Sequence, residues 1–203
     1  MKQQIIGFHQ DEFDDWVAEL ACNHNQHVRH QPPFQVRPWV ANEKGRRRQL
    51  GAELECRKCD DEPYYLRENR CLVRRYYDEL WNQWKFDLIP ELLAADFRFR
   101  GSVGVTTRGC STFREYVAMI RAAFPDFHNH IESMLADENR VVARLQYTAT
   151  HRGKIFDVEP TGNHISYPGV AIVSLGGHRL LSGWVLADRY ELMPQLGAIT
   201  EPS

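Results

Sequence analysis

The sequence predicts an α+β protein with a small, β-rich module at its N-terminus. Residues 1–62 carry clustered cysteines and histidines but few aliphatic side chains. Residues 72–124 show the hydrophobic period of helices, and residues 128–190 alternate between apolar and polar positions as antiparallel strands do. Helices followed by a strand meander predict three helices packed on one face of a curved antiparallel sheet.

The composition narrows the classes of protein to consider. The 203 residues are 43% hydrophobic and 26% charged, with a formal net charge of −2. This balance excludes a global attraction to nucleic acids or anionic membranes. No apolar run reaches the ~18 residues of a membrane span, and residues 1–6 lack the apolar core of a signal peptide. We therefore predict a cytoplasmic protein with no membrane partner.

The N-terminal module, predicted over residues 1–62, begins with a hairpin. Residues 5–8 and 16–20 have the character of strands and are joined across the acidic turn 11–15. An acidic, proline-containing seam at 60–66 separates the module from a second domain, predicted over 67–198. A module of this size with few aliphatic residues has a thin core, and such domains often depend on a metal.

The second domain begins with helices. Apolar residues from Leu72 to Trp81 form one stripe, residues 88–93 form a shorter one, and residues 113–124 form a third that ends at Pro125. Strands follow, with hairpin signals at 137–139 and Gly176-Gly177. The predicted strands are residues 97–99, 128–138, 140–152, 164–175 and 178–190.

Four side chains of the N-terminal module have the types and spacing of a zinc site. The five cysteines are an odd number for a disulfide framework, and three of them lie among histidines. A closed tetrahedron of such ligands is typical of structural Zn²⁺ and leaves no position open for catalysis. His27 and His30 are alternatives for the histidine ligand, and a module without metal is a further alternative. The predicted ligands are Cys22, His24, Cys56 and Cys59.

The remaining cysteines and the local positive charge have simpler interpretations. Cys71 lies in a helical pattern and Cys110 follows a glycine, so we interpret both as inert structural thiols. Arginines and histidines cluster in the module, above all at Arg46-Arg47-Arg48. This cluster favours a solvated basic face, with nucleic-acid binding as the alternative.

A series of short phrases in the second domain occurs in a fixed order. They are Tyr76-Tyr77-Asp78-Glu79-Leu80-Trp81-Asn82, Leu92-Leu93-Ala94-Ala95-Asp96-Phe97, Ala122-Ala123-Phe124-Pro125-Asp126-Phe127, His151-Arg152-Gly153, Pro160-Thr161-Gly162, and Trp184, Asp188 and Gln195-Leu196-Gly197. With these phrases, residues 68–197 resemble the SnoaL-like polyketide cyclases and ester cyclases. That resemblance implies the cone-shaped fold of nuclear transport factor 2-like proteins.

The N-terminal module also carries recognisable phrases. They are Gly7-Phe8-His9-Gln10, Trp16-Val17-Ala18-Glu19-Leu20, Cys22 and His24, Gln26-His27-Val28-Arg29-His30, Pro32-Pro33-Phe34, Arg37-Pro38-Trp39, and Cys56 and Cys59. Residues 2–61 resemble a small bacterial domain of uncharacterised function. This likeness indicates a domain boundary and implies no activity.

The resemblance to SnoaL-like cyclases implies acid/base catalysis without a metal or cofactor. Asp188 matches the family's acid/base aspartate, and His151 matches a pocket histidine that can donate to an oxyanion. Residues 184, 186 and 188 of a strand share one face, which is the concave one if Trp184 lines the cavity. The predicted substrate pocket contains Tyr77, Trp81, Arg100, Phe124, Tyr147 and Trp184.

Other interpretations of these residues stay open at this point. Asp188 could be a surface or hairpin residue, or pair with Arg189 or Arg152, and His151 could be an exposed turn residue. Arg100 stands where many ester cyclases carry histidine, a departure that weakens the family's usual chemistry here.

The predicted function is a cyclase or isomerase acting on a small hydrophobic carbonyl compound, in a homodimer or higher oligomer. The alternative is a ligand-binding or adaptor protein with a zinc-stabilised interaction module.

Overall fold

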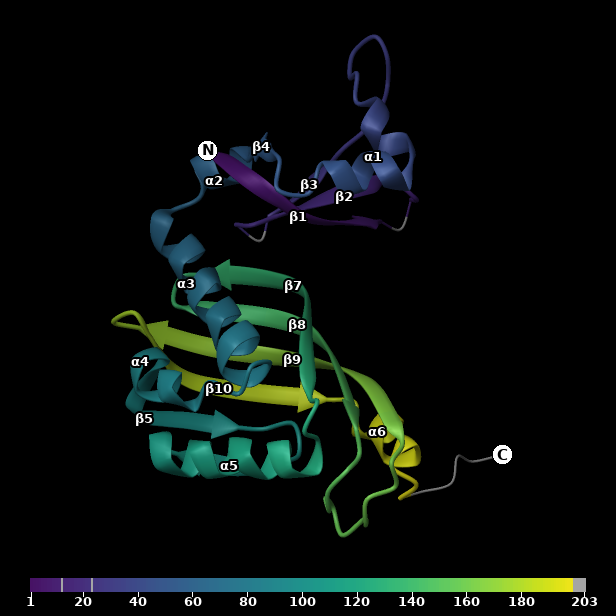
Figure 1. Cartoon of the computed structure of the whole chain (residues 1–203). Helices are drawn as coiled ribbons and strands as arrows, with labels where there is room; N and C mark the ends of the chain where they lie inside the picture. The colour runs from purple at the N-terminus through teal and green to yellow at the C-terminus, as the bar shows by residue number, and fades with distance from the viewer. Residues whose placement is uncertain (12, 23, 199–203) are drawn as a thin grey trace. The chain divides into compact units, whose positions relative to one another are not determined.

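The computed structural model describes residues 1–11, 13–22 and 24–198. The chain divides into two compact units, Met1–Arg67 and Glu68–Ser203, each with a hydrophobic core of its own. Figure 1 shows the order of their helices and strands along the chain. No helix in the described part of the chain is both long and apolar enough to cross a bilayer.

The N-terminal unit is built on a four-stranded antiparallel sheet in the order β3-β2-β1-β4 (Figure 1). Its elements are β1 (Lys2–Gln10), β2 (Trp16–Leu20), β3 (Asn25–His27), the 3-10 turn η1 (Pro38–Ala41), α1 (Glu43–Arg48), β4 (Glu53–Glu55) and α2 (Arg57–Asp61). Three cysteines belong to its small core, which consists of Ile5, Ala18, Leu20, Cys22, Val28, Val40, Cys56 and Cys59. A core of this size stabilises a fold by only about 3–5 kcal/mol or less.

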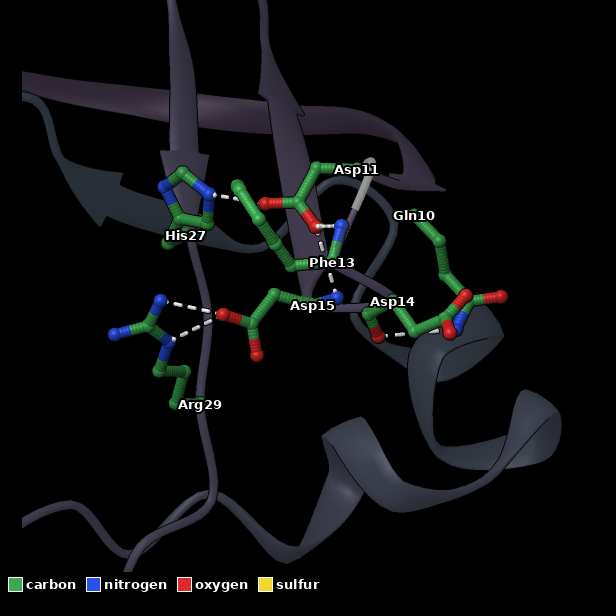
Figure 2. A network of polar contacts seen from close by, with 7 residues as sticks. All are labelled: Gln10, Asp11, Phe13, Asp14, Asp15, His27 and Arg29. Atoms are coloured by element: carbon green, nitrogen blue, oxygen red, sulfur yellow. Dashed lines mark hydrogen bonds and ion pairs between the residues drawn. The ribbon is translucent and has the colours of Figure 1, made fainter.

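The acidic turn between β1 and β2 is held by its own carboxylates, as Figure 2 shows. Asp11 accepts hydrogen bonds from the backbone N–H groups of Phe13 (2.9 Å) and Asp15 (3.0 Å), and its second oxygen lies 2.7 Å from His27 Nε2. The bond to His27 lowers the pKa of Asp11. Arg29 donates to Asp15 beside it. The hairpin predicted here is confirmed, although Glu12 lies outside the described residues.

The C-terminal unit contains a six-stranded sheet in the order β6-β5-β10-β9-β8-β7. Its elements are α3 (Tyr64–Arg75), the π-helical turn η2 (Tyr76–Trp81), the 3-10 turn η3 (Phe86–Leu88), α4 (Ile89–Leu92), β5 (Leu93–Arg100), β6 (Thr106–Arg108), α5 (Cys110–Ala123), β7 (His128–Asp137), β8 (Arg140–Thr150), β9 (His164–Gly176), β10 (Arg179–Ala187) and α6 (Arg189–Gln195). Neighbouring strands are antiparallel, except for the parallel pair of β5 and β10.

The predicted fold class, helices on a curled antiparallel sheet, is confirmed. Helix α5 ends directly before Phe124 and Pro125, as the pattern indicates. One element differs: the last strand stops at Ala187, and Asp188 begins the short helix α6. The prediction that the strand continues to residue 190 is wrong because Asp188 caps this helix, with its side chain accepting from the N–H of Glu191 (2.9 Å).

The two faces of the sheet differ in what covers them. On the inner face, alternate residues such as Leu145, Tyr167 and Val185 are buried with side chains from α3 and α5. On the outer face, Trp184 is 40% exposed and Leu186 is 54% exposed. The strands of the meander therefore carry apolar residues on both faces.

The long connection between β8 and β9 is anchored against the end of α5. The backbone N–H groups of Arg152 and Gly153 both donate to the carbonyl of Ala123, at 2.9 and 3.0 Å. A Cβ at residue 153 would lie 2.2 Å from the carbonyl oxygen of Ala122, so only glycine fits this approach. The Arg-Gly pair thus fixes where His151 lies.

Candidate functional site

An apolar cavity opens between the inner face of the sheet and the helices of the C-terminal unit. Its interior has room for about two water molecules, about 30 Å³, and the whole hollow with its open mouth measures about 470 Å³. Aromatic side chains dominate the walls. Those that carry a polar atom are Tyr76, Tyr77, Trp81, Tyr116, Tyr147 and Tyr167.

The phenols around this cavity are neutral donors. Burial raises the pKa of Tyr77 and of Tyr147 well above the ordinary value, and neighbouring phenols raise both further. The phenol groups of Tyr77, Tyr116 and Tyr167 all act on Tyr147, and the four residues line the same cavity. Desolvation likewise raises the pKa of each of the other phenols in the walls. At neutral pH the cavity therefore presents O–H groups and no phenolate.

The loop between β5 and β6 contributes to the cavity wall. Ser102 and Val103 in this loop are the half-buried members of the lining. Hydrogen bonding to Ser102 offsets part of the rise in the pKa of Tyr116 and Tyr167. Gly101 leaves space for Tyr116, since a Cβ there would lie 2.1 Å from the phenol oxygen.

The predicted pocket residues separate into two groups. Tyr77, Trp81, Phe124 and Tyr147 line the cavity. Arg100 does not: its guanidinium donates to the backbone carbonyl of Val185 (3.1 Å) and lies 5.4 Å from the ring centroid of Trp184. This cation–π contact is on the outer face of the sheet, where Trp184 is exposed.

Asp188 lies outside the cavity. The face predicted for residues 184, 186 and 188 is wrong, because Val185 and Ala187 are the buried members of the strand and Val185 lines the cavity. Asp188 is exposed and serves as the N-cap of α6. A strand that is apolar on both faces gives no periodic signal to say which face is concave, so the sequence pattern alone does not orient it.

His151 is fully buried next to the cavity wall. Its ring centroid lies 5.6 Å from that of Phe124, which lines the cavity, but His151 itself does not line it. The N–H of Thr161 donates to Nδ1 (3.3 Å), and the Thr161 hydroxyl lies 3.0 Å from the same nitrogen. Among the described residues Nε2 has no hydrogen-bond partner. His151 is thus buried with one ring nitrogen unsatisfied, and it is not the exposed turn residue of the alternative interpretation.

Some cavity residues were not predicted as site residues. Tyr76 and Tyr116 belong to helical stripes that indicate a core, and Tyr167 lies on an inward strand position. Asn129 is 4% exposed, lines the cavity and is the second residue of β7, which is rich in polar residues. The number of tyrosines at these core positions was a signal for a polar site, because buried phenol groups usually need polar partners.

The cysteines and the histidine predicted as metal ligands come together in the N-terminal unit. The ligand atoms of Cys22, His24, Cys56 and Cys59 all lie within 4.8 Å of one another. His24 Nδ1 is 3.6 Å from Cys22 Sγ and 3.4 Å from the Sγ atoms of Cys56 and Cys59. A tetrahedral zinc site has edges of about 3.5 Å between nitrogen and sulfur and about 3.8 Å between sulfurs. The Cys22–Cys56 separation is 3.8 Å, so the four residues could hold a metal ion.

The two alternative histidines have other partners. His27 Nε2 bonds Asp11, and His30 Nδ1 accepts from the backbone N–H of Arg37 (3.0 Å). The second nitrogen of His24 lies 3.3 Å from a carboxylate oxygen of Glu62, and both side chains are mostly buried. Carboxylates in this position orient metal-bound histidines. Burial raises the pKa of Cys22 to about 12, so an ion must displace thiol protons when it binds.

Much of the basic cluster in the N-terminal unit is engaged within the protein. The guanidinium of Arg46 lies 3.5 Å from the ring centroid of Trp16 and donates to the carbonyl of Val40 (2.7 Å). Arg47 pairs with Glu43 at 2.6 Å. These contacts agree with a structural and solvated role for the basic cluster.

Comparison with known proteins identifies both parts of the chain. Residues 71–196 match the family described as SnoaL-like polyketide cyclase, and residues 6–63 match the family described as protein of unknown function (DUF3565). No curated protein matches the chain significantly.

Solved structures share the fold of the C-terminal unit. A SnoaL-like protein of Jannaschia sp. CCS1 is 21% identical with a TM-score of 0.63, and the match covers 70% of this chain and 99% of that one. AclR of Streptomyces galilaeus is 24% identical with a TM-score of 0.60, covering 68% and 86%. A SnoaL-like polyketide cyclase of Agrobacterium tumefaciens C58 is 21% identical with a TM-score of 0.55, covering 64% and 98%.

Proposed function

The chain belongs to the SnoaL-like polyketide cyclase family through residues 71–196, and from this we propose that its C-terminal unit is a cyclase or isomerase acting on a small hydrophobic carbonyl compound. The reaction would form or shift bonds next to a carbonyl through an enol. The observation that carries this proposal is the convergence of neutral phenols in an apolar cavity. Donors of this kind stabilise the negative charge that develops on the carbonyl oxygen as a C–H proton leaves.

The proposed chemistry relies on hydrogen-bond donation. No carboxylate or imidazole belongs to the cavity lining among the described residues, so the proposed machinery consists of donors. His151 is one further donor, behind Phe124, and would reach a ligand only if that ring moved. A substrate whose C–H lies between two carbonyl groups suits such a site, because that C–H is acidic enough for a water molecule to accept its proton.

Ligand binding without turnover is the second candidate function. The exposure of Asp188 favours it, since the carboxylate that the family resemblance offers as acid and base faces solvent. The two candidates differ in whether the bound ketone exchanges its α-protons.

The test uses 2-tetralone, an enolisable bicyclic ketone, in deuterium oxide. We expect the protein to accelerate α-proton exchange, measured by NMR, and Tyr147→Phe to lower the acceleration by about 100-fold because one converging donor is lost. We expect Asp188→Asn to stay within about twofold of wild type, since asparagine caps a helix as well as aspartate.

Two outcomes would count against this assignment. Binding of 2-tetralone with no accelerated exchange would favour the non-catalytic candidate. Loss of exchange in Asp188→Asn, with unchanged thermal stability, would return the catalytic role to the aspartate and contradict a mechanism based on phenol donors.

We further propose that the ion of the N-terminal unit is Zn²⁺ in a structural role. Three thiolates and one imidazole suit zinc, and the distances among them match a tetrahedron. With four protein ligands, the ion would hold the loops together and bind no substrate. The residues would be Cys22, His24, Cys56 and Cys59.

Self-association through the outer face of the sheet is the partner that we propose for the C-terminal unit. Leu135, Val142, Ile172 and Trp184 are cross-strand neighbours in one row over four strands, and each is at least 37% exposed. An exposed apolar row of this kind marks an association surface. A second copy presents the same row and can cover it.

A charge in this row should separate the subunits. We expect wild type to show twice the 23.7 kDa chain mass or more in light scattering, and Ile172→Lys to show the monomer mass, because a buried unpaired charge is costly. Lys154→Glu, in the loop after β8, is the control and should keep the wild-type mass. A monomeric wild type, or an unchanged Ile172→Lys, would refute the proposed interface.

A further inference from the structure

The π-helical turn η2 changes which side chains share a face of the first helix. The backbone N–H of Asn82 donates to the carbonyl of Tyr77 at 2.9 Å, a bond that spans five residues. In an α-helix, positions five apart lie about 140° apart around the axis. One wider turn brings such positions nearly above each other, and π turns of this kind are frequent at functional sites. Here it places Tyr76 and Trp81, five residues apart, in the wall of one cavity.

The two rings lie edge to face in the cavity wall. The ring centroids are 6.4 Å apart and the ring planes cross at 77°. The indole offsets part of the burial-induced rise in the pKa of Tyr76. Even so, Trp81 Nε1 is buried with no hydrogen-bond partner in the described part of the chain, and Trp81 is only 5% exposed. An unsatisfied buried donor costs about 1–3 kcal/mol.

The turn that carries the pair is fixed by a second contact. Asn82 Oδ1 accepts from the backbone N–H of Asn129 (2.8 Å), and Asn82 Nδ2 donates to the Asn129 carbonyl (3.0 Å). These bonds determine the orientation of the Asn82 amide, and they join the end of η2 to strand β7. The position of Trp81 is therefore set by the backbone and does not depend on a ligand.

We propose that Tyr76 and Trp81 form a two-donor subsite that receives one acceptor oxygen of the ligand, a carbonyl or the enolate derived from it. This inference rests on the proposed function and assigns the atoms that recognise its substrate class. The oxygen would satisfy Trp81 Nε1–H and the phenol O–H at once, and the apolar walls would hold the carbon skeleton. A hydrocarbon of the same shape would leave the indole donor unsatisfied.

The test compares a ketone with its matching hydrocarbon. Calorimetry with 2-tetralone and tetralin gives the preference of the full-length protein for the oxygen. We expect Tyr76→Phe and Trp81→Phe each to lower the ketone affinity about tenfold, as the loss of one hydrogen bond of about 1.4 kcal/mol predicts. Tetralin affinity should stay within about twofold. Tyr190→Phe, at an exposed residue of α6 that does not line the cavity, is the control and should leave the ketone preference unchanged.

The carbonyl stretch of bound 2-tetralone gives a second readout that a purely structural role would not move. Two donors should shift it to lower frequency in wild type, and either substitution should reverse part of the shift. An equal loss of ketone and hydrocarbon affinity, an unshifted stretch, or the absence of a ketone preference in wild type would each overturn the subsite.

The failure of the subsite and the failure of the proposed function can be told apart. If 2-tetralone exchanges its α-protons on the protein but Tyr76→Phe keeps the ketone preference, the proposed function stands and the subsite is refuted. If the preference falls in both variants but no exchange occurs, the subsite stands and the C-terminal unit is a binding protein.

Discussion

Replacing Cys56 by serine is expected to unfold the N-terminal unit and to leave the C-terminal unit folded. Three of the eight buried residues in the N-terminal core are the cysteines of the proposed zinc site, and the core without them is too small to hold a fold. The binding free energy of a structural zinc, about 10–16 kcal/mol in small peptides, is in effect folding free energy. Loss of one of four ligands therefore removes most of the stability of this unit.

Metal analysis and NMR together check this prediction. Wild type should contain one zinc per chain and Cys56→Ser none, with resonances of Met1–Arg67 collapsing while those of the C-terminal unit persist. Cys71→Ser is the control, because Cys71 is exposed and belongs to the C-terminal unit. A folded, metal-free Cys56→Ser protein would contradict the structural role of the ion.

A milder substitution beside the same site is expected to weaken zinc binding without unfolding the N-terminal unit. Glu62→Gln keeps all four ligands but weakens the partner of His24 Nε2, at 3.3 Å. We expect its zinc affinity in chelator competition to fall by about 10–100-fold, with the fold retained when zinc is in excess.

Gly153→Ala is expected to destabilise the C-terminal unit by about 3 kcal/mol. A Cβ at this position would meet only backbone of α5, at 2.2 Å from the Ala122 oxygen and 2.9 Å from the Ala123 Cα. Backbone cannot move aside as a side chain can, so the cost lies at the upper end for overpacking. The bonds from residues 152 and 153 to the Ala123 carbonyl would break at the same time.

Urea unfolding of two variants in this loop separates crowding from backbone conformation. Gly162 has a φ of +75°, and a Cβ added to it would meet nothing within 4 Å, so Gly162→Ala should cost only about 1–2 kcal/mol. If Gly153→Ala proved no less stable than Gly162→Ala, the close approach to α5 would be wrong.

The fold was predictable because most of its elements can be recognised by their period and by their ends. Helix α5 has five buried residues on one stripe and stops at a proline, and β8 alternates buried and exposed positions along its length. The cluster of cysteines and histidine that could hold a metal ion was predictable for a different reason: two cysteines separated by two residues, in a segment poor in aliphatic residues, have few other uses. Neither argument needed the tertiary structure.

The cavity was predictable only in part. Tyr77, Trp81, Phe124 and Tyr147 are aromatic residues on apolar faces, and such residues line the interior whatever its function. The sequence does not tell which face of β10 lines the cavity, because Trp184, Val185 and Leu186 are all apolar. That strand ends just before Asp188, because the Asp188 side chain caps α6. This local hydrogen bond competes with further pairing between the strands, and the sequence pattern does not show which of the two prevails.

The π turn had no sequence signal that we could identify. The stripe from Leu72 to Trp81 fits an ordinary helix, because Leu80 and Trp81 are both apolar and so hide the change of register that the wider turn causes. The Arg-Gly pair after His151 shows the reverse case. It reads as part of a catalytic phrase, and its role in the structure is to pack the loop against α5.

The protonated phenols have a consequence for how the C-terminal unit meets its ligand. Every ionisable group in the described cavity wall is uncharged at neutral pH. A ligand that enters the cavity therefore displaces no counter-ions and changes the protonation state of no wall residue. Recognition should then be indifferent to ionic strength, and an electrically neutral guest should be preferred to the carboxylate or ammonium version of the same skeleton.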